Sequence, residues 1–270
     1  MRVLSWNLYH GRDFPPDPAL FTPRSRLLRR TERNASHVKV NRPLFDEFVR
    51  VLDGVDWDLA VLQEAPPRWF GELQRRTGSA GVRVLTSRNV FPPLQGVLAD
   101  WNPDLMASWE GGSNQILARA PARILEHRKL TLTRRPERRR MHWARLELPG
   151  ARPLCVANLH ASARRPAQAG AEVLAAAEAA VGWSAGAPLA FGGDLNLCPE
   201  AQPEPFALLR DRFGLREPTA PDAIDHVLVS GLEIAESPRR LAPERRELIE
   251  PCGLRLRLSD HAPIAGEFVK

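Results

Sequence analysis

Short apolar runs with polar side chains at their ends recur along this chain of 270 residues. The acids, amides and imidazoles stand in six segments: Trp6-Asn7, Gln63-Glu64, Asn158-Leu159-His160, Gly193-Asp194-Leu195-Asn196, Ile224-Asp225-His226 and Ser259-Asp260-His261. Short apolar runs bounded by turn residues are typical of buried strands. We therefore expect several strands to deliver carboxylates, amides and histidines to one edge of a sheet.

The order of the expected elements favours a mixed α/β (α+β) architecture. Strands are expected at 2–8, 59–62, 82–85, 115–119, 123–129, 142–148, 153–158, 189–191, 224–229, 232–235 and 264–269, and helices at 44–52, 69–73, 167–181 and 205–211. Residues 11–42 are expected to form a long loop with one helical turn near Leu27-Leu28, and residues 88–113 are expected to be irregular. Consecutive strands favour antiparallel pairing, and interleaved helices favour an outer layer. The pattern predicts one domain over 1–270, with two mixed, mostly antiparallel sheets packed as a sandwich and helices on the outer faces.

Composition sets limits on partners and location. The hydrophobic content of 43% suffices for one large core. The net charge of +6 suits a polyanion such as nucleic acid or an anionic lipid headgroup, although an arginine-rich chain could carry it without a binding role. The three cysteines, Cys155, Cys198 and Cys252, form no Cys-x-x-Cys pair, so a zinc site of that type is not expected. The cysteines fit a reduced, cytoplasmic setting, and no apolar stretch approaches the ~20 residues of a transmembrane helix. A monomer is favoured.

Carboxylates gathered at a sheet edge need a cation if they are to meet a phosphate group, because they repel it otherwise. Phosphodiester hydrolysis requires an activated water, neutralised phosphoryl oxygens and a protonated leaving group. A divalent metal together with a carboxylate–histidine pair can supply all three. The polar strand ends therefore predict a metal-dependent phosphoesterase.

The six segments closely resemble the endonuclease/exonuclease/phosphatase superfamily, which includes pancreatic-type deoxyribonuclease, apurinic endonucleases, inositol-phosphate phosphatases and bacterial sphingomyelinases. The resemblance runs from Trp6 to Ile264 with the segments in the family's order. It implies that Glu64 is the principal metal carboxylate, with Asn7 and Asp260 as companions. Hard oxygen ligands of this kind suit Mg²⁺ or Mn²⁺.

The same resemblance implies the roles of the remaining polar residues. His261 is expected to contact the scissile phosphate or to handle the nucleophilic water, and Asp225 to orient that histidine. Asp194 and Asn196 are expected to position the attacking water and a phosphate oxygen. His160 is expected to bind the phosphate or to protonate the leaving oxygen.

Some features depart from the family pattern. Apurinic endonucleases carry a tyrosine where this chain has His160, which argues against repair of abasic sites. His226 is expected to face away from the site, because its neighbour Asp225 should face inward. The glutamate that pairs with the first histidine in the pancreatic-type enzyme has no evident counterpart. Asn114 is a candidate phosphate contact, and the arginine run 134–140 is a candidate phosphate-neutralising surface.

The substrate stays open at this stage. The net positive charge favours a phosphodiesterase or nuclease that cleaves nucleic acid. The alternatives are a phosphatase or phosphodiesterase acting on inositol phosphate or phospholipid headgroups and, more remotely, a non-catalytic binding module on the same fold.

Overall fold

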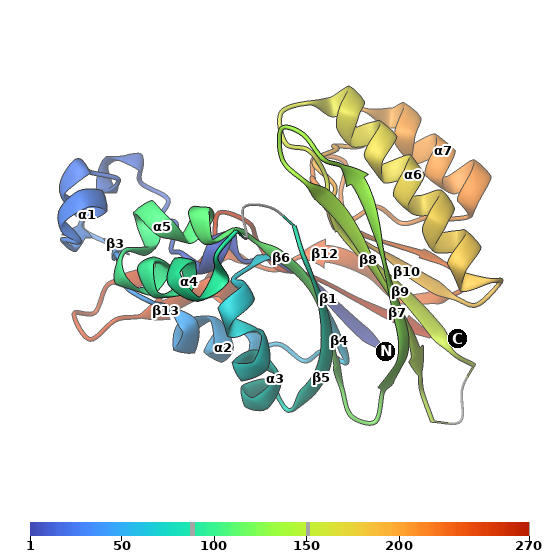
Figure 1. Ribbon diagram of the computed structural model, residues 1–270, viewed down its shortest axis with the longest axis horizontal. Helices are drawn as coiled ribbons and strands as arrows, with labels where there is room; N and C mark the ends of the chain where they lie inside the picture. Colours follow the sequence, from blue (N-terminus) through green and yellow to red (C-terminus); the bar gives the residue numbers. More distant parts are fainter. Residues whose placement is uncertain (87–89, 150–151, 270) are drawn as a thin grey trace.

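Two large β-sheets pack face to face in the computed structural model, which describes residues 1–86, 90–149 and 152–269 (Figure 1). The first sheet has the strand order β12 (Glu233–Arg240), β15 (Ile264–Val269), β1 (Arg2–Asn7), β4 (Leu59–Ala65), β6 (Ser113–Arg119) and β5 (Ser79–Leu85). The second has the order β11 (Asp225–Ser230), β10 (Leu189–Asp194), β9 (Leu154–His160), β8 (Arg139–Glu147) and β7 (Arg123–Thr133). Neighbouring strands are antiparallel except for the parallel pairs β1–β4 and β9–β10.

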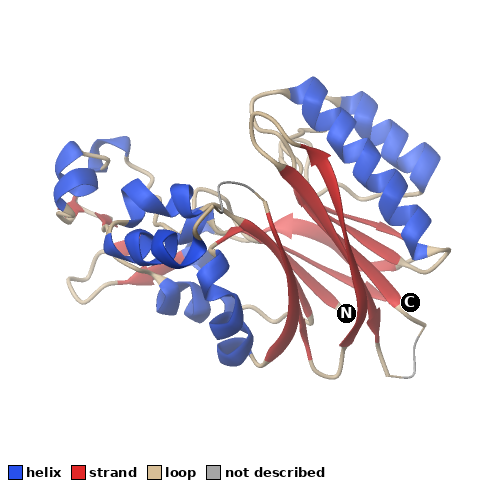
Figure 2. Cartoon of the chain, viewed as in Figure 1, coloured by secondary structure: helices blue, strands red, loops and turns tan. Residues whose placement is uncertain are grey.

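Helices cover the outer faces of both sheets (Figure 2). On the side of the first sheet lie α2 (Phe45–Asp53), α3 (Phe70–Thr77), α4 (Pro92–Trp101) and α5 (Pro103–Glu110), and on the side of the second lie α6 (Pro166–Ser184) and α7 (Pro203–Phe213). The remaining elements are α1 (Pro23–Leu28), the strand pairs β2 (Glu32–Arg33) with β3 (Val38–Lys39) and β13 (Glu247–Ile249) with β14 (Arg255–Arg257), and the 3-10 turns η1 (Tyr9–Gly11), η2 (Pro18–Leu20), η3 (Pro67–Trp69) and η4 (Pro243–Arg246). The predicted sandwich with outer helices is confirmed.

Strand alternation decides which side chains enter each core layer. On β1, Val3 belongs to the core between the sheets, whereas Leu4 and Trp6 belong to the core under α2 and α3. Successive side chains of a strand point to opposite faces, so Ser5 and Asn7 follow Val3 on the inner face. The polar ends of the strands therefore meet between the two sheets.

Residues 88–113 were expected to be irregular, and this prediction was wrong for the described part; residues 88 and 89 lie outside the described residues. The stretch forms α4 and α5. Its prolines favour a break in the middle of a helix, but here they stand in the first turn, where the missing N–H costs nothing. Asn102 caps α5 by accepting a hydrogen bond from the Leu105 amide at 3.2 Å.

Residues 11–42 contain the helical turn expected near Leu27-Leu28, which forms as α1 and is capped by Thr22. They also contain the β2–β3 pair, which the sequence did not predict. Lys39 is fully buried there, with Nζ 2.6 Å from Asp13 Oδ1 and 2.9 Å from Asp104 Oδ1. This ion cluster ties the segment to α5. No helix among the described residues is long and apolar enough to cross a membrane.

Candidate active site

The strand register brings the predicted polar residues to one end of the sandwich. Asp194, the last residue of β10, pairs with His160 on β9 and with Asp225 on β11. In the other sheet Asn7 ends β1, and its Nδ2 donates a hydrogen bond to Asp194 Oδ2 at 3.0 Å. The two sheets are therefore joined at the site by a side-chain contact between residues that are far apart in sequence.

His261 lies in the segment before β15 and contacts the same group of carboxylates. Its Nδ1 is 2.7 Å from Asp225 Oδ2, and its Nε2 is 3.8 Å from both Asp194 Oδ2 and Asp260 Oδ1. Trp6 Nε1 donates to the His261 carbonyl at 3.0 Å. The imidazole is thus fixed at one nitrogen and presents the other to two acids.

Ser259 holds the turn that carries this histidine. Its Oγ donates to the Asn7 carbonyl at 2.7 Å and accepts from the His261 amide at 3.1 Å. Its φ of 58° lies in the left-handed region, as do those of Glu64 at 46° and Asn196 at 50°. Such conformations cost free energy in non-glycine residues and cluster at functional sites.

Glu64 lies where the β4–β6 pairing shifts register. Its Oε2 is 3.4 Å from His10 Nε2, and its Oε1 is 3.8 Å from His160 Nδ1. His10 was not among the residues singled out from the sequence. It reaches Glu64 from η1 through a left-handed φ of 53°, and no local pattern predicts that turn.

The two histidines nearest Asp194 have opposite electrostatic environments. Burial and the positive charge of Arg139 lower the pKa of His160 to about 3. Burial also acts against the charge on His261, but the negative charges of Asp225 and Asp194 outweigh it and raise its pKa to about 10. At neutral pH His160 is uncharged and His261 is an imidazolium.

The carboxylates Asp194 and Glu64 also have pKa values that are shifted in opposite directions. Burial and the charge of Asp225 raise the pKa of Asp194 to about 7. Burial favours a higher pKa for Glu64 as well, yet the nearby charges of His10, His160 and Arg12 together lower it to about 2. The charge of His261 lowers it as well. Glu64 is therefore a permanent anion at the site.

The residues present fit a divalent cation. Burial raises the pKa of Asp260, and the charge of Glu64 raises it further, so these two carboxylates lie close enough to repel. Asp194 and Asp225 lie in a cluster with His261 in which one polar side-chain atom of each residue is within 4.8 Å of the others; the imidazolium has no free lone pair, so the carboxylates are the ligands that this cluster offers. Asp225 Oδ1 is buried and has no hydrogen-bond partner among the described residues. Crowded, incompletely paired carboxylate oxygens are the donor set that Mg²⁺ or Mn²⁺ prefers.

Of the remaining residues considered in the sequence, one lies at the site and two lie away from it. Asn196 is at the site, where its backbone N–H donates to Asp194 Oδ1 at 3.2 Å and its side-chain Nδ2 donates to the Ala161 carbonyl at 3.1 Å. Asn114 is fully buried, its Nδ2 donates to the Arg140 carbonyl at 2.8 Å, and it does not line the pocket that contains Glu64 and His160. His226 faces away from the site, as expected, with Nε2 2.9 Å from the Ala223 carbonyl oxygen.

Arginine-run residues also enter the site. A pocket of about 140 Å³ contains Glu64 and His160 together with Arg139 and Glu137 of the β7–β8 hairpin. Arg139 Nη2 is 3.1 Å from Glu137 Oε2. The sequence drew attention to the run 134–140 as a whole, but it did not distinguish the arginine next to the histidine from its neighbours.

Residues 4–261 match the model of the Endonuclease/Exonuclease/phosphatase family. The chain belongs to this family. It is accordingly a phosphoesterase of the endonuclease/exonuclease/phosphatase superfamily, whose enzymes generally use a divalent metal. No match was found among curated proteins.

Solved structures of this family share the fold at low sequence identity. A mannosyl-6-phosphatase from Bacteroides thetaiotaomicron is 13% identical with a TM-score of 0.64, and the match covers 100% of both chains. Truncated TDP2 from Caenorhabditis elegans is 16% identical with a TM-score of 0.59, covering 100% of this chain and 97% of the other. The catalytic domain of human Nocturnin, with bound sulfate, is 17% identical with a TM-score of 0.57, covering 99% and 93%. These likenesses describe the fold and leave the substrate open.

Proposed function

We propose that the protein is a divalent-metal-dependent phosphodiesterase that cleaves nucleic acid. The observation that carries the proposal is the meeting of His261, Asp225 and Asp194, which come from three separate segments, beside the carboxylates Glu64 and Asp260. A binding module has no need of this complete set of acids and imidazoles. We further propose that the chain acts as a single domain, as a monomer and in the cytoplasm.

Glu64 and Asp260 would hold the metal, with Asn7 beside them. When bound, the metal neutralises phosphoryl charge and makes a bound water more acidic. Asn7 is already oriented, because its Oδ1 accepts from the Tyr9 amide at 2.9 Å while its Nδ2 donates to Asp194. The second lone pair of that oxygen can face a cation.

The protein groups divide the proton handling among them. His261, charged and held by Asp225, donates a hydrogen bond from Nε2 to the phosphate and gives this proton to the leaving oxygen as its bond to phosphorus breaks. Asp194, with a pKa of about 7, accepts the proton of the attacking water, which Asn196 helps to position. His160, uncharged at neutral pH, donates a hydrogen bond to the phosphate. Titratable groups whose pKa values are pushed apart are the expected acid and base partners.

A phospholipid headgroup is the second candidate substrate, and one surface feature favours it. On α4 the side chains of Leu94, Val97 and Trp101 are 48%, 66% and 58% exposed. Their spacing places them along one side of the helix. Exposed apolar side chains of this kind can insert into a lipid surface.

Incubation with supercoiled plasmid in Mg²⁺, in Mn²⁺ and in EDTA tests the proposal. We expect metal-dependent nicking that is lost in His261→Ala and kept in His127→Ala, since His127 is exposed on β7 away from the site. A parallel assay with phospholipid vesicles tests the second candidate. Release of a headgroup without any nicking would exclude nucleic acid as the substrate.

A further inference from the structure

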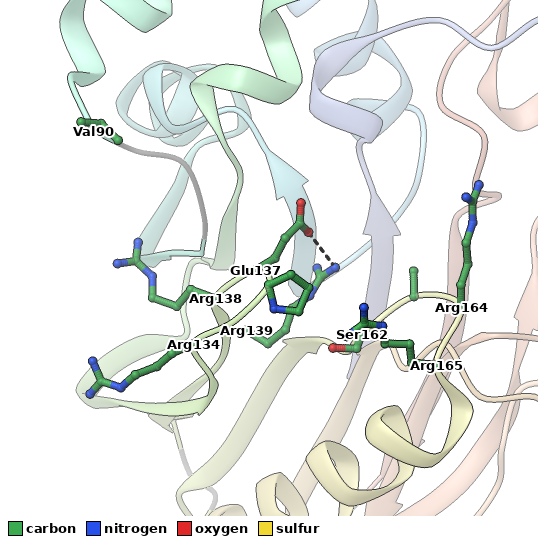
Figure 3. A pocket seen from close by; sticks show the side chains of 10 residues that line it. Val90, Arg134, Glu137, Arg138, Arg139, Ser162, Arg164 and Arg165 are labelled. Carbon is green, nitrogen blue, oxygen red and sulfur yellow. Dashed lines mark hydrogen bonds and ion pairs between the residues drawn. The ribbon is translucent and has the colours of Figure 1, made fainter.

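A second pocket, of about 780 Å³, adjoins the pocket that contains Glu64 and His160, which we call the catalytic pocket; half of the residues that line the second pocket are arginines (Figure 3). Glu137 and Arg139 line both pockets, so the two are adjacent. The β7–β8 hairpin contributes Arg134 and Arg138 on one side, and Arg164 lies on the other side. The pocket is therefore basic on both of its walls.

The walls are fixed by backbone contacts. Arg138 Nε donates to the Thr86 carbonyl, which anchors the hairpin to the end of β5. Across the pocket, Arg164 has a left-handed φ of 59°, and Arg165 precedes the first residue of α6 without capping it through its side chain. The amino end of a helix adds partial positive charge to the same wall.

The positive charge of this pocket is poorly compensated. Among the described residues, Arg139 alone of the lining arginines is ion-paired to a carboxylate, that of Glu137. Even this arginine keeps a buried Nε that has no hydrogen-bond partner in the described part of the chain. Burial and the charges of Arg138 and Arg134 lower the pKa of Arg140 behind them. Unpaired buried donors and crowded like charges favour an anion in the pocket.

A further pocket also adjoins the catalytic pocket. It has a volume of about 760 Å³, shares Ser108 with the catalytic pocket, and includes Tyr9 and Phe21. Aromatic side chains are the surfaces on which nucleobases stack. The catalytic pocket therefore has two neighbouring pockets, which suits a substrate that extends beyond the reacting phosphate.

We propose that the arginine pocket binds a second phosphate of the substrate, the one that follows the scissile phosphate along a nucleic-acid strand. The proposal rests on the proposed function, since it deepens the choice of a polyanionic substrate. Arg139, at the boundary of the two pockets, contributes its free Nε to the phosphate, and Arg134 and Arg164 approach from opposite walls.

Calorimetric titration with two nucleotides in Mg²⁺ tests the pocket. Adenosine 3′,5′-bisphosphate has two phosphates, and adenosine 5′-monophosphate has one. We expect the bisphosphate to bind the wild type about tenfold more tightly, as charge-assisted contacts to one phosphate allow. The advantage should disappear in the double variant Arg134→Ala/Arg164→Ala and persist in Arg239→Ala, an exposed arginine on β12. Equal binding of both nucleotides to the wild type, or an advantage that survives the double variant, would overturn the proposal.

An oligonucleotide separates this pocket from the proposed function. The plot of log affinity against log salt should become shallower by about one in the double variant, because one phosphate loses its neutralising contacts. An unchanged slope would count against the pocket. A wild type that prefers the bisphosphate but cleaves no oligonucleotide would support the second-phosphate site and overturn nuclease activity.

Discussion

At the scale of single residues, the alternation of side chains along a strand places one neighbour in the site and the next in the packed core. Asp225 and His226 are neighbours on β11, yet Asp225 faces the site and His226 packs against Phe206 of α7, with ring centroids 5.0 Å apart. The alternation could be anticipated from the sequence, and with it the outward direction of His226. The approach of His10 to Glu64 could not be anticipated, because it depends on a left-handed turn that no local pattern specifies.

Asp225→Asn tests the imidazolium at the site. The pKa of His261 is raised to about 10 against the effect of burial, chiefly by Asp225 and Asp194. Loss of the Asp225 charge lowers this pKa, so His261 loses its proton at lower pH. We expect kcat to fall about 10²–10⁴-fold and its alkaline limb to move to lower pH. His226→Asn should lower the melting temperature without this change in the pH profile; identical profiles for wild type and Asp225→Asn would refute the pairing.

His142 predicts a pH dependence of stability away from the site. It is fully buried, and burial and the charge of His127 lower its pKa to about 4 from the ordinary value of 6.5. The unfolded chain therefore takes up this proton at higher pH than the folded chain. The contribution of His142 to the free energy of unfolding is therefore fully present above pH 6.5. It is lost as the pH falls from 6.5 to 4, which lowers the free energy of unfolding by about 3 kcal/mol. Urea unfolding between pH 7 and 4 should show a smaller loss in His142→Leu; parallel curves would contradict the assignment.

At the scale of elements, the sequence predicts the strands and amphipathic helices well and the proline-rich segments poorly. The helix at 44–52 is visible from its apolar spacing, and α2 forms there. By contrast, Pro92 and Pro103 suggest irregular chain although each begins a helix. The same residue type breaks a helix in its middle and starts one at its first turn, so local sequence alone does not decide between them.

Lys39→Met tests the ion cluster that ties the segment 11–42 to α5. Without the ammonium group, the buried carboxylate of Asp13 and that of Asp104 lose their shared partner. We expect the free energy of unfolding to fall by about 3–5 kcal/mol. Chemical denaturation measures this loss, and Lys129→Met, an exposed lysine on β7, should change stability by less than about 0.5 kcal/mol. Comparable effects of the two substitutions would contradict the role of the cluster.

Gly192→Ala tests the close approach of β10 and β11 beneath Asp194. An added Cβ would lie 2.0 Å from the His226 carbonyl oxygen, so the strands would have to separate. We expect a loss of at least about 2 kcal/mol in stability. Gly182→Ala, in α6 with open space around the new Cβ, should instead stabilise by about 0.5–1 kcal/mol. Thermal unfolding of the two variants measures both changes in stability. A Gly192→Ala variant as stable as the wild type would show that the contact between the strands is not tight.

At the scale of the whole molecule, the site exists because two sheets meet at one end. The sequence indicates that Asn7, His160 and Asp194 end strands, but their meeting depends on the parallel pairs β1–β4 and β9–β10 and on the packing of the sheets. Six matching segments in the family's order made this arrangement predictable. The arginine pocket lay beyond prediction, because its walls come from the β7–β8 hairpin and the segment before α6, which sequence alone does not bring together.

Hydrolysis of bis(p-nitrophenyl) phosphate as a function of Mn²⁺ concentration tests the central claim most directly, because this substrate has a single phosphodiester and needs no binding groove. The account predicts that activity rises to saturation with metal, disappears in EDTA and returns on re-addition. It also predicts that Glu64→Gln, which removes the permanently charged carboxylate, needs at least about tenfold more metal for half of its maximal rate. Hydrolysis that is unaffected by EDTA, or a Glu64→Gln variant with the metal dependence of the wild type, would contradict the proposed metal-dependent site.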